Sequence, residues 1–207
     1  YGYFGDDGAY RAAIRWWMRT RHGWEVDEDA ILSTNGLVNG AGLCVQTWSD
    51  PGEAVVLFTP VYHAFARVIR AAGREVRECP LAICDGRYEM DFDAWDGLMQ
   101  GNERIAILCS PHNPGGRVWT EAELRGVGAF CARHGLILVS DEVHHDLVMP
   151  GRRHVPAAVA LPDLAERLVM MSATTKTFNI AGAHVGNVII HDPALRRGAA
   201  DQDSGQG

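Results

Sequence analysis

LILVSDE, at residues 136–142, begins with four apolar residues and ends with two carboxylates, Asp141 and Glu142. A short apolar run bounded by polar residues is typical of a strand that is buried on both faces of a sheet. Residues 120–134 before it have the pattern of a helix, with Thr120 as its N-cap and Gly135 just after its end. The stretch therefore predicts a helix followed by a buried strand that ends in acidic side chains.

The same alternation extends in both directions along the chain. Runs that predict strands lie at residues 30–33, 54–58, 75–79, 105–109, 168–172 and 188–190. Helical patterns lie at residues 9–22, 37–48, 62–72 and 92–100. Apolar strands that alternate with helices predict an α/β fold, with a mostly parallel sheet covered by helices on both faces in three layers, α/β/α.

Polar residues follow these predicted strands at their carboxyl ends. They lie at residues 34–36, 59–60, 110–113, 141–142 and 172–176. In open α/β sheets, ligands bind outside the carboxyl ends of the strands. We therefore expect one binding site that is built from these segments together.

The chain has a single lysine, Lys176, among its 19 basic residues, and this lysine lies in the last of the polar segments. Arginine stays protonated, whereas a partly desolvated lysine can become a neutral amine that attacks a carbonyl. A genome that favours arginine codons would also leave few lysines. The place of Lys176 among the other polar segments favours the chemical explanation.

The composition argues against several other classes of protein. The 207 residues are 47% hydrophobic and 22% charged, which is ordinary for a globular domain. A net charge of −7 without a basic run argues against a nucleic-acid surface, and no apolar stretch is long enough for a membrane span. The five cysteines lack CxxC spacing, which indicates free thiols in a reducing cytoplasm. His144 and His145 would point in opposite directions on an extended segment, so we expect no metal site.

The polar segments supply the groups that an aldehyde cofactor on a lysine needs. Lys176 supplies the amine, and Asp141 supplies a carboxylate for a pyridinium nitrogen. Asn113 offers an amide donor for a phenolate oxygen, and Tyr62 offers a ring for stacking. Residues 36–38 open a predicted helix, whose free backbone amides suit a phosphate.

Three motifs resemble those of the fold-type I pyridoxal-phosphate enzymes. They are SPHNPGGRVW at 110–119, DEVHHD at 141–146 and TKTFNIAG at 175–182. More narrowly, they resemble the MalY/PatB-type cystathionine β-lyases, which lie within the aminotransferase class I/II superfamily. The resemblance runs from about residue 1 to residue 193, which is nearly the whole chain.

The resemblance implies a role for each candidate residue. Lys176 would bond pyridoxal 5′-phosphate covalently and then move protons, while Asp141 would pair with the ring nitrogen. Asn113 would bind the phenolate oxygen, and Tyr62 would stack on the ring. Contacts to the phosphate are expected from Gly36, Leu37, Val38, Ser172 and Thr175, with Tyr3 reaching the phosphate of the neighbouring subunit in a homodimer.

His144 favours one reaction over its alternatives. Typical aminotransferases of this superfamily carry a tyrosine three residues after the aspartate, whereas the β-lyase branch carries a histidine, as here. The resemblance therefore implies a lyase that cleaves cystathionine or a related S-substituted cysteine to a thiol, pyruvate and ammonia. An aminotransferase is the first alternative, and a non-catalytic regulatory protein on this scaffold is the second.

Two positions depart from the usual pattern of phosphate contacts. Ala173 stands where many relatives have a serine, and His184 stands roughly where aminotransferases have an arginine. The expected organisation is an N-terminal helix and partner-contact segment at 1–24, a cofactor-binding large domain at 25–193 and a disordered tail at 194–207. The family's chain is longer, so the rest of an N-terminal arm and a C-terminal small domain are expected to be missing.

Overall fold

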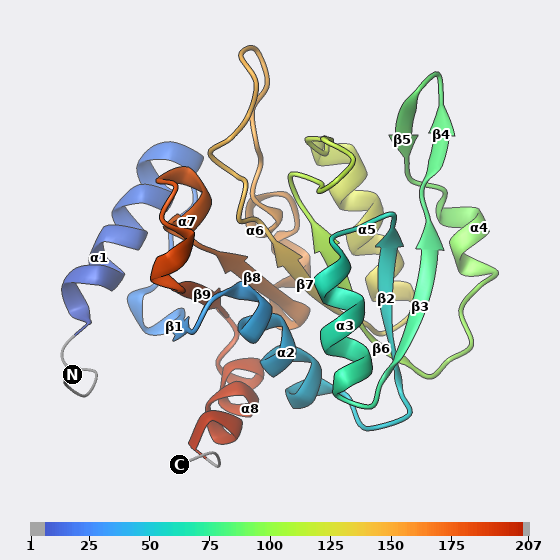
Figure 1. Cartoon of the computed structure of the whole chain (residues 1–207), viewed down its shortest axis with the longest axis horizontal. Helices are drawn as coiled ribbons and strands as arrows, with labels where there is room; N and C mark the ends of the chain where they lie inside the picture. The colour runs from blue at the N-terminus through green and yellow to red at the C-terminus, as the bar shows by residue number, and fades with distance from the viewer. Residues whose placement is uncertain (1–6, 205–207) are drawn as a thin grey trace.

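The computed structural model describes residues 7–204, and its centre is a seven-stranded sheet in the order β1-β9-β8-β7-β6-β2-β3 (Figure 1). Its strands are β1 (Ile31–Thr34), β2 (Ala54–Thr59), β3 (Glu75–Pro80), β6 (Glu103–Cys109), β7 (Ile137–Asp141), β8 (Leu168–Ser172) and β9 (Gly186–Ile189). β4 (Ala82–Cys84) and β5 (Arg87–Glu89) form a separate antiparallel hairpin. The predicted strand pattern missed this hairpin because each of its strands has only three residues.

Helices cover the sheet on both faces. The α-helices are α1 (Gly8–Trp17), α2 (Leu37–Trp48), α3 (His63–Ala71), α4 (Phe92–Asp96), α5 (Glu121–Arg133), α6 (Ala157–Ala160), α7 (Thr174–Thr177) and α8 (Pro193–Ser204). Shorter turns of helix are η1 (Met18–His22), η2 (Glu28–Ala30), η3 (Pro162–Arg167) and η4 (Ala181–Ala183), of which η1 is a π-helix that continues α1.

Most neighbouring strands run parallel, as the sequence predicts. β2 is parallel to β3 and to β6, β6 to β7, and β7 to β8. β9 is the exception, since it is antiparallel to both of its neighbours, β1 and β8. The α/β fold with a mostly parallel sheet is therefore confirmed, and the carboxyl ends of the parallel strands lie along one edge.

Two apolar layers hold the helices against the sheet. Side chains alternate along β2, so that Val56 and Phe58 join the layer under α4 and α5, while Val55 and Leu57 join the layer under α2 and α3. Trp95 of α4 is fully buried in the first of these layers. Burial on both faces is the reason that the strands read as continuous apolar runs.

The sequence predicts the N-cap of α5 but does not predict the helix α8 or its cap. Thr120 caps α5, and its hydroxyl accepts a hydrogen bond from the Glu123 amide (3.2 Å) while the Glu123 carboxylate accepts one from the Thr120 amide (2.7 Å). At the other end of the chain, the prediction of disorder from residue 194 differs from the structure, which forms α8 there. Asp192 accepts a hydrogen bond from the Leu195 amide (2.6 Å), and Leu195 packs on the layer under α2. This cap and this apolar contact support the helix despite its polar composition.

The β4–β5 hairpin stands apart from the sheet (Figure 1). It carries Cys84, the exposed one of the five free cysteines, whereas the other four are buried. Among residues 7–204, no helix has the length and apolar character needed to cross a membrane.

Candidate active site

Three of the predicted site residues lie where β6, β7 and β8 end. Asp141 is the last residue of β7, and it pairs with Cys109 of β6 on one side and with Met171 of β8 on the other. Asn113 follows β6, and Lys176 lies in α7, which begins directly after β8. The sheet register therefore brings three distant sequence segments to one edge.

Asp141 is a buried carboxylate with little compensation for its charge. Its side chain accepts a hydrogen bond from the Val143 amide (3.1 Å), and no arginine or lysine forms an ion pair with it among the described residues. Burial raises the pKa of Asp141 to about 6, against the lowering effects of the Val143 amide, His145 and Lys176. A cationic group beside this carboxylate would recover the charged form.

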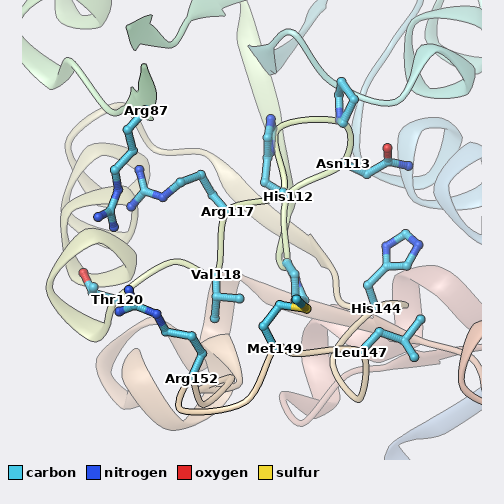
Figure 2. A pocket seen from close by; sticks show the side chains of 13 residues that line it. Arg87, His112, Asn113, Arg117, Val118, Thr120, His144, Leu147, Met149 and Arg152 are labelled. Carbon is cyan, nitrogen blue, oxygen red and sulfur yellow. The ribbon is translucent and has the colours of Figure 1, made fainter. Parts of the chain in front are cut away.

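His144 is half-buried and lies within the electrostatic reach of Lys176. Burial, together with the positive charges of Lys176 and His145, lowers the pKa of His144. Its imidazole is therefore neutral at pH 7, with one nitrogen able to donate and the other able to accept a hydrogen bond. His144 and Asn113 line the same pocket, which has a volume of about 550 Å³ (Figure 2).

The turn that carries Asn113 is held from both of its sides. His112 is buried, and its Nε2 lies 2.8 Å from the Pro60 carbonyl oxygen, which connects this turn to the segment before Tyr62. Trp119 Nε1 donates a hydrogen bond to the Cys109 carbonyl (3.0 Å). These two bonds fix the backbone on which Asn113 is presented.

Tyr62 and residues 36–38 lie at the starts of two helices. Tyr62 is half-buried at the N-cap of α3, with its ring edge-on to Phe65. Gly36 is the N-cap of α2 with φ +81°, a conformation that favours glycine. Gly186 of β9 lies so close that an added Cβ would be 2.9 Å from the carbonyl carbon of Gly36. The first turn of α2, with Leu37 and Val38, therefore has its backbone set against β9.

The structure places the other predicted residues less centrally. Ser172 is buried at the end of β8, and its hydroxyl has no hydrogen-bond partner among the described residues. It lines an apolar cavity of about 230 Å³ under α1, together with Tyr10 and Phe178, and not the pocket of Asn113. Thr175 is half-buried in α7. Tyr3 lies outside the described residues.

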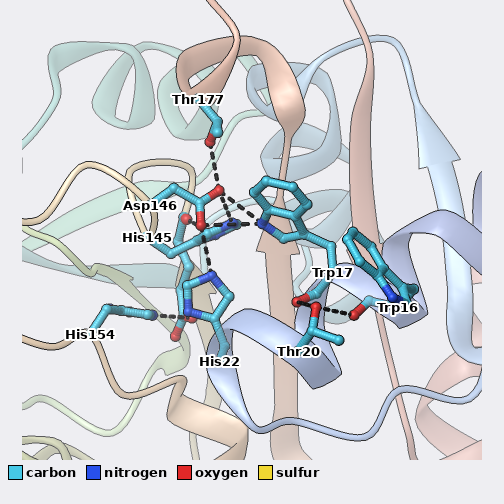
Figure 3. Close-up of polar contacts among 9 residues, drawn as sticks. Trp16, Trp17, Thr20, His22, His145, Asp146, His154 and Thr177 are labelled. Atoms are coloured by element: carbon cyan, nitrogen blue, oxygen red, sulfur yellow. Dashed lines mark hydrogen bonds and ion pairs between the residues drawn. The ribbon is translucent and has the colours of Figure 1, made fainter.

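Asp146, five residues after Asp141, has the opposite surroundings. We call Trp17, His22, His145, Asp146 and Thr177 the Asp146 cluster (Figure 3). The Asp146 carboxylate accepts hydrogen bonds from Trp17 Nε1 (3.0 Å) and Thr177 Oγ1 (2.8 Å). His22 Nε2 and His145 Nε2 lie 2.9 Å and 3.1 Å from its two oxygens. The cluster thus joins α1 and η1 to the residue that follows Lys176.

His145 is charged in this cluster. Its Nδ1 lies 2.6 Å from the Glu142 carbonyl oxygen and its Nε2 lies against the Asp146 carboxylate, and both of these groups only accept hydrogen bonds. Burial opposes a charge on His145, but the hydrogen bond and charge of Asp146 raise its pKa. Burial likewise opposes ionisation of Asp146, yet the hydrogen bonds from His145 and His22 hold its pKa far below the usual range.

His22 and the role of Asp146 are not predicted by the sequence. His22 ends the first predicted helix, 124 residues from Asp146, and no local pattern connects the two. One nitrogen or oxygen atom from each of His22, His145 and Asp146 lies within 4.8 Å of the other two, a spacing that would also suit a metal ion. Hydrogen bonds from Trp17 and Thr177 already occupy the carboxylate, so the cluster is better explained as a structural network.

The chain is similar to one family over almost its whole length. Residues 1–205 match the family described as aminotransferase class I and II. The sequence is 39% identical over 197 residues to cystathionine beta-lyase PatB of Bacillus subtilis (strain 168), which covers 95% of this chain and 51% of that protein. It is 32% identical over 189 residues to Protein MalY of Escherichia coli (strain K12), with 90% of this chain and 47% of that protein covered.

Solved structures show the same similarity. Cystalysin from Treponema denticola, which contains a pyridoxal 5′-phosphate cofactor, superposes with a TM-score of 0.94 at 36% identity, over 99% of this chain and 52% of that one. The pyridoxal-phosphate-bound C–S lyase from Staphylococcus hominis superposes with a TM-score of 0.86 at 31% identity, over 94% and 50% of the two chains. The chain spans about half the length of the relatives that it matches.

Proposed function

Because the chain belongs to the aminotransferase class I and II family, we propose that it is the pyridoxal-phosphate-binding part of a carbon–sulfur β-lyase. The substrate would be an S-substituted cysteine such as cystathionine, and the products would be a thiol, pyruvate and ammonia. The observation that carries the proposal is Asp141, a buried carboxylate without an ion-pair partner among the described residues, at the strand end beside α7 and its Lys176.

The residues of the site fit pyridoxal phosphate. Asp141 offers a buried carboxylate that needs a cation, and a protonated pyridine nitrogen is such a cation. Among the described residues, Leu37 and Val38 have free amides in the first turn of a 12-residue helix, which suits a phosphate, whereas the Gly36 amide already donates to the Thr34 carbonyl (2.9 Å). Gly186 leaves room for that turn, because any Cβ there would displace Gly36 or Leu37. Asn113, Tyr62 and Thr175 remain the candidates for the phenolate oxygen, the ring face and a further phosphate contact.

When bound, pyridoxal phosphate supplies an electron sink for the bonds at the substrate's α-carbon. The part of the protein is then to move one proton and to keep charges in place. Lys176 would take the α-proton at its amine, and the C–S bond would break with its electron pair leaving on the thiolate. The remaining three-carbon fragment takes up water and gives pyruvate and ammonia.

The surroundings of Lys176 support its role as a proton carrier. The neutral imidazole of His144 adds no positive charge beside it, and Thr177 fixes the end of α7 through its bond to Asp146. Lys176 itself is exposed. The amine of Lys176 is therefore accessible for proton transfer, and the helical turn that carries it is held in place by Thr177.

An absorbance spectrum after addition of pyridoxal phosphate, followed by borohydride reduction and peptide mapping, tests the cofactor. We expect a visible band near that of other lysine-bound forms of this cofactor and a reduced adduct on Lys176. A folded protein that yields no adduct, or an adduct elsewhere, would contradict the proposal. The Lys176→Arg variant is the matched control, because it keeps the charge and cannot form the bond.

An aminotransferase is the alternative, and the family match itself favours it as the second candidate. The two reactions separate by their need for a keto acid. A β-lyase releases pyruvate and thiol from an S-substituted cysteine without any added keto acid. A transaminase turns over only when a keto acid accepts the amino group, and this result would replace the lyase proposal.

We also propose that the protein is a homodimer in the cytoplasm, with Tyr3 at the site of its partner. Exposed apolar side chains near α1 and α7 support an interface there, namely Trp16 (55% exposed), Phe178 (52%) and Ile180 (45%). Five free cysteines agree with a reducing compartment. Sedimentation of the intact protein tests the dimer, and a monomer at micromolar concentration would contradict it.

A further inference from the structure

The pocket that contains Asn113 and His144 extends well beyond these two residues. Its volume of about 550 Å³ exceeds what a cysteine side chain would fill. Figure 2 shows Asn113 and His144 at one end, and Arg87 and Arg152 at the other. The pocket therefore connects the candidate active site to a region of quite different chemistry.

The middle of this pocket is apolar. Val118 and Met149 line it between the two ends, and Leu147 lies beside His144 (Figure 2). Leu147 is 55% exposed and Met149 is 76% exposed, so both have apolar area in contact with water at this pocket. An alkyl chain along this surface would remove their apolar area from water.

The far end of the pocket has two unpaired cations. Neither the Arg87 nor the Arg152 guanidinium has a hydrogen bond or an ion pair within the part of the chain that the structure describes. Seven other arginines do have a carboxylate within 4.0 Å, namely Arg11, Arg15, Arg77, Arg104, Arg117, Arg125 and Arg133. Arg70 and Arg153 also lack such a partner among the described residues, but they do not line this pocket, whereas the exposed Arg87 and Arg152 do.

Arg117 lies between these two arginines but is already engaged. Its guanidinium donates to the Tyr88 carbonyl and pairs with Glu123, and it lies 4.6 Å from the centre of the Trp119 ring. The bond to Tyr88 ties β5, which carries Arg87, to the wall of the pocket. Arg117 therefore positions the pocket and leaves the binding of an anion to the other two arginines.

The loop that carries Arg152 is also fixed at its base. Glu142, next to Asp141, accepts hydrogen bonds from His154 Nε2 (2.7 Å) and from the Ala157 amide (2.8 Å), and all three residues are buried. Because Glu142 directly follows the strand end of the candidate active site, the position of Arg152 is set relative to that site. Two anchored segments thus present the two free guanidinium groups.

We propose that Arg87 and Arg152 bind a carboxylate at the far end of the sulfur substituent, so that the enzyme selects S-substituted cysteines whose alkyl chain ends in an acid. This inference rests on the proposed β-lyase function and adds a substrate class and two specificity residues to it. Val118, Leu147 and Met149 contact the alkyl chain, while the guanidinium groups form charge-assisted hydrogen bonds to the terminal carboxylate.

The test compares two substrates that differ in one group, S-(2-carboxyethyl)cysteine and its carboxamide S-(2-carbamoylethyl)cysteine. Pyruvate release is measured with the intact holoenzyme, its Arg87→Gln/Arg152→Gln variant and the control Arg70→Gln/Arg153→Gln. Arg153 is a suitable control because it follows Arg152 in the same loop but extends toward Gly23. Arg70 is exposed in the last turn of α3 and does not line the pocket.

We expect the wild-type enzyme to prefer the carboxylate substrate by about tenfold or more in kcat/KM, as for one or two hydrogen bonds to a charged group. The Arg87→Gln/Arg152→Gln variant should lose this preference because its KM for the carboxylate substrate rises. Its kcat for the carboxamide should stay unchanged. The Arg70→Gln/Arg153→Gln control should keep the wild-type preference. The preference should also shrink at high salt. Equal kcat/KM values for the two substrates in wild type, or an unchanged ratio in the variant, would overturn the inference.

A binding measurement separates this inference from the proposed function. Calorimetric titration of both compounds into Lys176→Ala protein, with and without the two arginine substitutions, reports the same preference without turnover. If neither compound is cleaved by wild type, the β-lyase proposal fails, while calorimetry still decides whether the arginines bind the carboxylate. If both are cleaved equally well and bind equally well, the β-lyase function stands and the arginine inference fails.

Discussion

Asp141 and Asp146 lie five residues apart after the same strand, yet their surroundings differ completely. Asp141 is buried with a single amide donor, and burial raises its pKa to about 6. Asp146 accepts a hydrogen bond from Trp17, and its interactions with His145, His22 and Thr177 hold its pKa far below the usual range against the effect of burial. The negative charge of Asp141 therefore has no cation beside it to stabilise it, whereas the charge of Asp146 is stabilised by side chains of the protein itself.

A carboxylate that is free to bind a ligand differs from a structural one in how the protein stabilises its charge. A group whose charge is stabilised by its own fold contributes to stability and has little capacity left for a ligand. A buried group whose charge is not stabilised costs stability until a ligand arrives. We therefore expect mutation of the two aspartates to change activity and stability in opposite ways.

The largest effect should come from Asp141→Asn in the intact holoenzyme. Removing the carboxylate that would hold the ring nitrogen protonated should lower kcat by about a hundredfold or more, as for loss of a preorganised electrostatic partner. Steady-state pyruvate release measures this. Asp146→Asn is the matched control and should reduce kcat far less; equal losses in the two variants would remove the distinction.

Asp146→Asn should cause the larger loss of stability. The change leaves the charged, buried His145 without its anion and weakens the bonds from Trp17 and His22, so a destabilisation of about 3 kcal/mol is expected. Urea unfolding of the cofactor-free protein measures it. A variant as stable as wild type would show that the network is not a structural element.

The pH dependence of stability should separate the two sites in sign. The folded pKa of Asp141 is raised, so the cost of its charge is absent below about pH 4 and grows up to about pH 6. The cofactor-free Asp141→Asn protein should therefore be more stable than wild type by about 3 kcal/mol above pH 6. For Asp146 the folded pKa is lowered, so its contribution is present above about pH 4 and lost as pH falls further. The contribution of His145 is present below about pH 6.5 and lost as pH rises through its raised folded pKa.

Unfolding curves between pH 3.5 and pH 8 measure both effects. The difference between wild type and Asp146→Asn should be greatest between about pH 4 and pH 6.5, where Asp146 and His145 are both charged. The difference for Asp141→Asn should instead be greatest above pH 6. Parallel profiles for the two variants would mean that the contrast between the sites is not electrostatic.

Thr177→Val should give the smallest effect. It removes the 2.8 Å hydrogen bond between Thr177 Oγ1 and Asp146 and keeps the shape of the side chain, at a cost of about 1 kcal/mol. Because α7 would be less firmly held, retention of pyridoxal phosphate on dilution should also weaken by a few fold. Thr177→Ser restores the hydroxyl and should recover both properties, which a purely steric role of the threonine would not allow.

Much of the fold was predictable because its signals are local. The apolar runs of β2, β6, β7 and β8 predict buried strands, and Thr120 with Glu123 forms the capping box of α5. The antiparallel direction of β9 was not predictable, since strand direction depends on the path of the chain and not on composition. The polar composition of α8 does not predict a helix. The helix is instead stabilised by the cap from Asp192, which precedes it, and by the packing of Leu195 on the apolar layer under α2.

The candidate site shows the same division. The sequence predicts that Lys176, Asp141 and Asn113 lie at one edge of the sheet because each follows an apolar strand, and the structure places them there, while their roles stay a prediction. His22 and the two free arginines were not found, because Arg87 lies on a short hairpin and His22 meets Asp146 across 124 residues. Pairings of this kind depend on tertiary structure, and one sequence contains no local trace of them.

The hairpin of β4 and β5 offers a practical means of observing the protein. Cys84 pairs directly with Arg87 across the two strands, and it is the exposed thiol of a chain whose other four cysteines are buried. Among the five cysteines of this chain, a fluorescent maleimide should therefore label Cys84, on the hairpin that carries Arg87. Its emission would report in real time whether the mouth of the pocket closes when an acidic compound arrives, and it would do so even for compounds that never react.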